Sequence, residues 1–223
     1  MQLIIGNKNY SSWSMRPWVL MKQLGIPFQE RKLRFDFNEG SAFRLEVARH
    51  NPAGKVPVLL DGDLAVSDTL AITEYLAEQH PGVWPAQRQA RARARSLACE
   101  MHSGFGALRN HCPMNIEAAL PEVGARIWTE QPAVRADVAR TEAAWAQALA
   151  TSGGPFLFGD FCAADAFFAP VCTRLATYAL PVSDVARAYM QRNAAAPGVA
   201  AWLADALAEQ DYLDFEEPYR KQR

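Results

Sequence analysis

The stretch NKNYSSWSMRPWVLMKQLG, residues 7–25, follows a short apolar run, QLIIG at residues 2–6, and ends at a glycine. The apolar run predicts a buried strand, and the apolar residues after the serines recur at helical spacing. Three hydroxyls, Ser11, Ser12 and Ser14, stand where this helix begins, although an N-cap requires only one. A helix N-terminus stabilises an anion, and a thiolate placed there has a pKa below its usual value of about 8.5. The cluster is therefore either a simple N-cap or a site for a reactive sulfur.

Composition limits the classes of function. The chain has 223 residues, half of them hydrophobic, a formal net charge of −1 and a pI near 6.4. This length favours two small domains, and the near-neutral charge argues against a nucleic-acid or anionic-membrane partner. The four cysteines form no CxxC pair, which argues against a disulfide framework and a redox dithiol. Since no secretory leader or membrane-spanning run is recognisable, we expect a cytoplasmic protein with small-molecule or protein partners.

The first eighty residues alternate between strand and helix signals. After the first strand and helix come a strand at 28–35, a helix at 41–51, a hairpin at 56–67 and a helix from residue 68 that stops at Pro81-Gly82. The order βαβαββα predicts an α/β domain with a mixed or parallel sheet.

A proline-rich linker, PGVWPAQ at residues 81–87, precedes a region of helical character. Its Ala-, Leu- and Arg-rich stretches predict helices at 88–109, 122–151, 163–178, 184–195 and 197–209. We therefore expect an α/β domain at 1–80, the linker, and an all-α domain at 88–223. The last fourteen residues are expected to form a polar tail that is frayed or laid on the surface.

Two further segments of the first domain offer groups to a peptide-like ligand. In NPAGKVPVL, Pro57 enters a strand without an N–H, and a cis bond before it would turn the backbone of Val56 outward. An ordinary edge-strand proline is the alternative. In SDTLAITEYL, a helix begins at Asp68 and Thr69, where its N-terminus and the hydroxyl can hold a carboxylate while the aspartate holds an ammonium. Helix capping is the alternative there.

These motifs, in this order and followed by an all-helical region, resemble a cytosolic glutathione transferase over essentially the whole chain. SSWSMR is similar to the SSCSxR signature of the zeta class, whose members include maleylacetoacetate isomerases. FGDFCAADAFFAP, residues 158–170, resembles the helix-capping motif of the family. In that motif Cys162 replaces the usual Ser or Thr, so Asp165 has to supply the backbone acceptor, and some loss of stability is expected.

The resemblance implies a thioredoxin-like first domain, glutathione as co-substrate, a homodimer and a role in detoxification. Ser11 matches the serine whose hydroxyl activates the glutathione sulfur, whereas counting back from Arg16, as in theta-like members, selects Ser12. Trp13 stands where the zeta signature has cysteine, so the resemblance implies an indole beside the sulfur.

The resemblance also implies how glutathione is held. Val56 and Pro57, the latter after a cis bond, bind the cysteinyl backbone. Asp68 and Thr69 bind the γ-glutamyl group, and Lys55 reaches toward the glycine carboxylate.

The electrophile is expected between the two domains, against Trp13 and the first long helix of the second domain. The candidate binding residues on that helix are Met101, His102, Phe105 and Arg109. Arg109 could orient an anionic substrate, although a surface ion pair is the commoner role of a helix arginine. The same stretch contains Cys99, His102, His111 and Cys112, whose spacing fits no standard zinc pattern, so no metal site is expected.

The implied reaction is attack of the glutathione thiolate, stabilised by Ser11 and the helix N-terminus, on a small electrophile. Glutathione-dependent cis-trans isomerisation of the maleylacetoacetate type is the alternative within enzymes, and an anionic dienoic substrate would favour it. A glutathione-binding or regulatory module without catalysis is the alternative from another class of protein.

Overall fold

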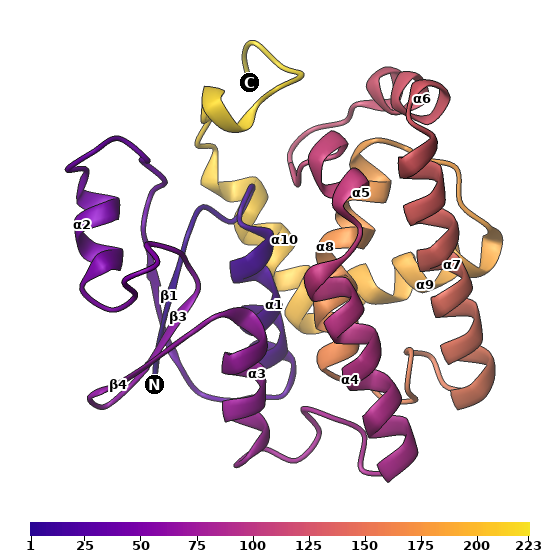
Figure 1. Cartoon of the computed structure of the whole chain (residues 1–223), viewed down its shortest axis with the longest axis horizontal. Helices are drawn as coiled ribbons and strands as arrows, with labels where there is room; N and C mark the ends of the chain where they lie inside the picture. The colour runs from indigo at the N-terminus through magenta and orange to yellow at the C-terminus, as the bar shows by residue number, and fades with distance from the viewer.

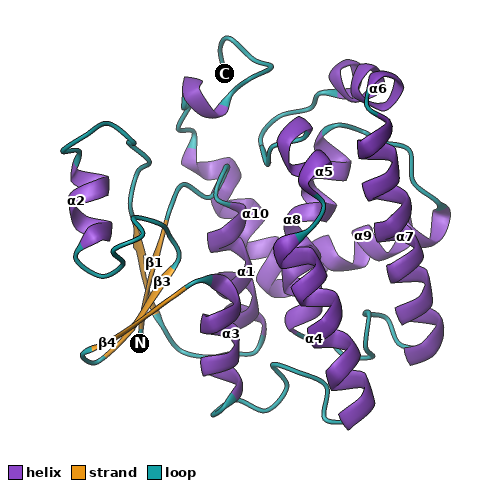
Figure 2. Ribbon diagram, in the orientation of Figure 1, coloured by secondary structure: helices purple, strands orange, loops and turns teal.

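A computed structural model describes residues 1–223, with all four strands in the N-terminal part and a helical C-terminal part (Figure 1; Figure 2). The strands are β1 (Gln2–Ile5), β2 (Gln29–Lys32), β3 (Val58–Asp61) and β4 (Leu64–Ser67). They form one sheet in the order β2-β1-β3-β4, in which β1 pairs with β2 in parallel and the other pairs are antiparallel. The apolar β1 is internal to the sheet and its last three residues are buried, as its sequence predicts.

Three helices complete the N-terminal part: α1 (Ser12–Gln23), α2 (Ala42–Ala48) and α3 (Thr69–Ala77). The order βαβαββα is therefore confirmed. In Figure 1, α1 and α3 lie between the sheet and the helical part, and α2 lies on the opposite side of the sheet. This arrangement places the N-termini of α1 and α3 beside the helical part.

The helical part contains α4 (Arg88–Ser103), α5 (Gly106–His111), α6 (Pro121–Glu130), α7 (Pro132–Ser152), α8 (Ala163–Thr177), α9 (Asp184–Ala195), α10 (Pro197–Glu209) and a final turn, η1 (Asp214–Glu216). No helix is long and apolar enough to cross a membrane.

Two predicted helices are each divided in the structure. The predicted helix at 88–109 breaks at Gly104, and Phe105 after it takes a left-handed conformation with φ 56°. The predicted helix at 122–151 breaks at Gln131, whose backbone is not helical (φ −115°, ψ 85°) because Pro132 disfavours the helical conformation of the residue before it. Both breaks turn the chain without interrupting the core.

One hydrophobic core of 46 buried residues runs through both parts, so they do not pack as separate units. Helix α1 contacts both α8 and α10. At Gly198 a Cβ would lie 2.6 Å from the carbonyl oxygen of Val19, so only glycine allows α10 to approach α1 this closely. The orientation of α1 is thus set by the helical part as well as by the sheet.

Helix α8 begins with the capping arrangement that its sequence predicts. The carboxylate of Asp165 accepts hydrogen bonds from the backbone N–H groups of Cys162 at 3.0 Å and Leu157 at 3.1 Å. It also accepts one from the hydroxyl of Tyr189 at 3.0 Å. The aspartate therefore satisfies the backbone at the start of this buried helix.

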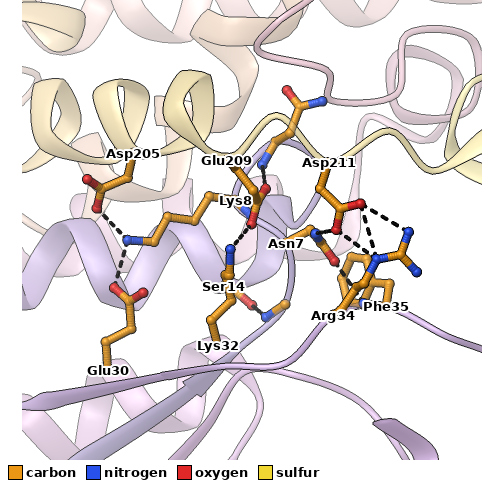
Figure 3. A network of polar contacts seen from close by, with 12 residues as sticks. Asn7, Lys8, Ser14, Glu30, Lys32, Arg34, Phe35, Asp205, Glu209 and Asp211 are labelled. Carbon is orange, nitrogen blue, oxygen red and sulfur yellow. Dashed lines mark hydrogen bonds and ion pairs between the residues drawn. The ribbon is translucent and has the colours of Figure 1, made fainter. Parts of the chain in front are cut away.

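A buried lysine connects the loop after β1 to α10 (Figure 3). The ammonium of Lys8 lies 2.7 Å from Glu30 and 2.5 Å from Asp205, and its side chain is 5% exposed. It also lies 4.3 Å from the ring centroid of Trp18 and 5.3 Å from that of Trp202. Because these partners come from β2, α1 and α10, the ammonium of Lys8 links three elements.

We expect Lys8→Met to lower the free energy of unfolding by about 2–3 kcal/mol, because both carboxylates lose their cation in a partly buried site. Urea denaturation followed by circular dichroism measures this change. Lys22→Met, at an exposed position in the last turn of α1, is the control and should leave stability nearly unchanged. Equal stability of the two variants would contradict the role assigned to Lys8.

Candidate functional site

A cavity of about 650 Å³ opens at the N-terminus of α1, between the sheet part and the helical part. Nine of the residues singled out from the sequence line it: Ser11, Ser12, Trp13, Lys55, Val56, Pro57, Asp68, Thr69 and Arg109. Three do not: Met101, His102 and Phe105. Met101 is fully buried in the core, and Phe105 packs against Phe168 with ring centroids 6.4 Å apart. The prediction that these two residues face the electrophile is therefore wrong.

The hydroxyls at the start of α1 have different partners. Ser11 is the N-cap residue but makes no capping bond, and its Oγ lies 2.7 Å from the Oγ of Ser14. Ser14 Oγ in turn accepts a hydrogen bond from the backbone N–H of Gly6 at 3.2 Å. The Oγ of Ser12 accepts one from the guanidinium of Arg174 at 3.2 Å. Simple capping therefore does not account for the serine cluster.

The first turn of α1 also has backbone N–H groups without a hydrogen-bond acceptor. The N–H groups of Ser11 and Ser12 bond to carbonyls within the preceding loop. Those of Trp13 and Ser14 have no backbone acceptor. An anion beside Ser11 would therefore meet a hydroxyl, free N–H groups and the positive end of the helix dipole.

The loop before β3 presents unpaired backbone to the same cavity. The peptide bond between Val56 and Pro57 is cis. Neither the N–H nor the C=O of Val56 has a hydrogen-bond partner within the protein. The preceding loop is held by Asn51, whose side chain donates to the carbonyl of Lys55 at 2.8 Å. This backbone can pair with an extended peptide.

At the start of α3, Asp68 has a left-handed backbone with φ 76°. One carboxylate oxygen, Oδ1, caps the helix by accepting from the N–H groups of Leu70 at 2.8 Å and Ala71 at 3.3 Å. Asp68 is thus both the predicted cap and a residue that lines the cavity. The hydroxyl of Thr69 donates to the carbonyl of Trp13 at 3.2 Å, so its backbone N–H, not its hydroxyl, remains for a ligand.

Two arginines bring positive charge to the cavity wall. Arg174 on α8, 5% exposed, donates to Ser12 and to the carbonyl of Cys112 and has no carboxylate partner. Burial and the neighbouring Arg109 lower its pKa to about 10, so it stays charged at neutral pH. Arg109 donates to the carbonyls of Met101 and His102, while its Nε is buried without a partner. Arg109 is therefore not paired with a surface carboxylate.

Arg174 was not among the residues predicted from the sequence. The available signal was a single arginine in the mostly apolar α8, a pattern that a buried functional cation and a solvated helix position share. Arg16 is a similar case, since it is 1% exposed and all three of its guanidinium nitrogens lack a hydrogen-bond partner. Its guanidinium lies 4.2 Å from the ring centroid of Trp13.

The C-terminal segment forms one wall of the cavity, where Glu216 lines it. Leu213 and Glu217 are buried, so the tail is not frayed. It is laid on the surface, the other predicted alternative, and Asp214, Phe215 and the last three residues are exposed. The hydroxyl of Tyr10 donates to the Glu217 carboxylate at 2.7 Å, and Asn115 donates to the same carboxylate at 2.8 Å. The residue directly before Ser11 is therefore fixed by the end of the chain.

We expect Tyr10→Phe to lower the free energy of unfolding by about 1–2 kcal/mol, because buried polar groups of Glu217 and Leu213 lose a partner. Urea denaturation measures the change. The matched control is Tyr75→Phe, which removes a tyrosine–carboxylate bond of 2.7 Å to Asp61 near the surface and should change stability less. A larger loss in the control would contradict the importance of the tail contact.

Comparison with known proteins agrees with this geometry. The family model for the glutathione S-transferase N-terminal domain matches residues 10–79, and that for the C-terminal domain matches residues 88–205. The chain belongs to the glutathione S-transferase family.

Two individual relatives share about a third or less of the aligned residues with this chain. The chain is 32% identical to glutathione S-transferase theta-1 of Bos taurus over 143 residues, 63% of this chain and 56% of the relative. It is 28% identical to a probable maleylacetoacetate isomerase of Vibrio cholerae over 112 residues, 49% of this chain and 52% of the relative. The alignments thus span about half the length of these two relatives. A glutathione transferase homolog from Burkholderia, solved with bound glutathione, shares the fold with a TM-score of 0.68 at 24% identity, over 92% of this chain and 97% of that one.

Proposed function

We propose that this protein is a serine-type, zeta-like glutathione transferase that activates the thiol of glutathione for attack on a small electrophile. The observation that carries the proposal is the convergence of three features on one cavity. These are the hydroxyls and free N–H groups at the α1 N-terminus, the unpaired backbone of Val56, and the Asp68–Thr69 turn at the start of α3.

The charges of the tripeptide match these features. Its cysteinyl backbone would pair with Val56, which has both a donor and an acceptor unused. Its α-ammonium would meet Asp68, while its α-carboxylate would accept from the N–H of Thr69 at the α3 N-terminus. Lys55, on the same wall as Val56, would take the glycine carboxylate.

Activation of the thiol follows from the serine pair. Ser11 Oγ donates to Ser14 Oγ, which also accepts from the N–H of Gly6. Because both hydroxyls can rotate, Ser14 would donate to Ser11 instead once a sulfur lies beside Ser11. The proton of Ser11 is then free to point into the cavity toward the sulfur. Together with the helix dipole this donor stabilises the thiolate before attack, and no covalent bond to the protein is needed.

We expect glutathione bound to the wild-type protein to have a thiol pKa well below its value in water, and Ser11→Ala to raise that pKa by about one unit or more. Ultraviolet thiolate absorbance as a function of pH measures it. Ser12→Ala tests the neighbouring hydroxyl, and Ser96→Ala, at an exposed position on α4, is the control. Tight binding with an unshifted thiol pKa would favour the non-catalytic binding module instead.

The arginines favour an anionic electrophile and keep isomerisation of the maleylacetoacetate type as the second candidate function. Arg109 and Arg174 line the cavity and neither has a carboxylate partner in hydrogen-bonding contact. Glutathione has only two carboxylates, and these are assigned to the α3 N-terminus and to Lys55. The two cations therefore remain for a negatively charged group on the second substrate.

We expect Arg174→Gln to reduce kcat/KM for an anionic nitroaryl halide at least about tenfold, a loss of about 1.4 kcal/mol of transition-state stabilisation. The kcat/KM for an uncharged nitroaryl halide of the same shape should change by less than about threefold. Arg174→Lys, which keeps the charge, should recover part of the loss. An equal fall for both electrophiles would mean that Arg174 has only a structural role.

The family resemblance also leads us to infer a homodimer that acts in the cytoplasm in detoxification. The chain mass is 24.7 kDa, so light scattering should give twice this mass for the protein in solution. A monomeric mass at micromolar concentration would contradict this part of the proposal.

A further inference from the structure

The imidazole of His102 contacts the carboxylate of Asp68, although His102 belongs to α4 in the helical part. Its Nε2 lies 3.3 Å from Asp68 Oδ2, the oxygen that the α3 cap leaves free. The ring packs edge-on against Trp13 with centroids 5.1 Å apart, and its Nδ1 is buried without a partner. The imidazole is thus held beside Asp68 by packing, and thiol activation makes no use of it.

The charges around His102 come from three elements. Asp68 faces it from the β4–α3 junction, Arg16 from α1 and Arg109 from α5. The rings that pack against it, Trp13 and Phe167, carry no charge. Burial lowers the pKa of His102 below its usual value, and the two arginines lower it further, while Asp68 opposes them. The imidazole is therefore mostly neutral at neutral pH and takes up a proton only at a lower pH than an exposed histidine does.

We propose that His102 positions Asp68 for the α-ammonium of glutathione and, once protonated, competes with that ammonium for Asp68 Oδ2. The inference rests on the proposed function, in which Asp68 binds the γ-glutamyl head group. A neutral imidazole orients the free oxygen and leaves its negative charge for the ligand. An imidazolium at the same place neutralises Asp68 and repels the ammonium.

The sign of the pH dependence follows from linkage. In the free protein the negative charge of Asp68 favours protonated His102. The ammonium of the bound ligand offsets that charge, so the pKa of His102 is lower in the complex than in the free protein. Binding in mild acid must then expel a proton, and affinity must fall as pH falls through the pKa of free His102. A histidine that only packed against Trp13 would produce neither effect.

The test is calorimetric titration with S-methylglutathione, whose blocked sulfur cannot ionise, at pH 7.5 and pH 5.5 in two buffers of different ionisation enthalpy. We expect wild-type affinity to be about fivefold weaker at pH 5.5, the size of a partly exposed ion pair, with net proton release on binding. In His102→Gln the affinities should agree within about twofold, without proton release. The analogue of S-methylglutathione that lacks the α-amino group offers no cation to Asp68 and keeps its α-carboxylate, so it should not bind the wild-type protein more weakly at pH 5.5 than at pH 7.5.

The control is His50→Gln. His50 is also an imidazole near a carboxylate, with its Nε2 3.5 Å from Glu46, but it does not line the cavity, so its replacement should keep the wild-type pH dependence. Wild-type affinity that is equal at both pH values, or a pH dependence that persists in His102→Gln, would overturn the inference. If His102→Gln does not fold, the analogue decides the question with the wild-type protein. Absence of binding at pH 7.5 would instead refute the proposed glutathione site, and the inference with it.

Discussion

The loop from Asn7 to Ser11 is held in one position by side chains from the far end of the chain, and the rest of the site depends on that constraint. Glu209 accepts hydrogen bonds from the backbone N–H groups of Lys8 at 3.2 Å and Asn9 at 3.1 Å. Asp211 accepts a hydrogen bond from the side chain of Asn7 (Figure 3). Glu217 accepts one from the hydroxyl of Tyr10. This loop ends at Ser11, so the α1 N-terminus and its hydroxyls are positioned by both parts of the molecule. Preorganised donors of this kind stabilise charge without reorganising during the reaction.

Positive charge gathers where the two parts meet, and carboxylates there are few. Arg16, Arg109 and Arg174 belong to three different helices, and burial lowers the pKa of each guanidinium. Arg109, Arg174 and Lys55 line the cavity together with the carboxylates of Asp68 and Glu216. Near the two arginines the cavity therefore favours anions, whether a thiolate or an acidic group on the electrophile. Asp68 is the exception among the residues near His102, and its position suits the single cation of glutathione. The site thus has one acidic side chain for an ammonium and several cationic groups for anions. This matches glutathione, which has one ammonium, two carboxylates and a thiolate, together with an acidic second substrate.

The sequence predicts the fold well because strand and helix periodicities and turn residues are local. The βαβαββα order, the hairpin and the cap of α8 by Asp165 all follow from neighbouring residues. The buried side chains that anchor the tail were not predicted because their partners are distant in sequence: Tyr10 and Glu217 are 207 residues apart. Arg174 was missed for the same reason, because only tertiary packing brings it to Ser12. The contact between His102 and Asp68 likewise depends on how α4 meets α3, which periodicity does not reveal.

The central claim is that glutathione lies in this cavity with its sulfur at the α1 N-terminus and its cysteinyl backbone on Val56. A crystal structure of the complex with glutathione tests this most directly. The account predicts the sulfur within hydrogen-bond distance of Ser11 Oγ, two backbone hydrogen bonds between the cysteinyl residue and Val56, and the ammonium beside Asp68 Oδ2. Glutathione bound elsewhere, or bound here with its sulfur turned away from both Ser11 and Ser12, would contradict the account.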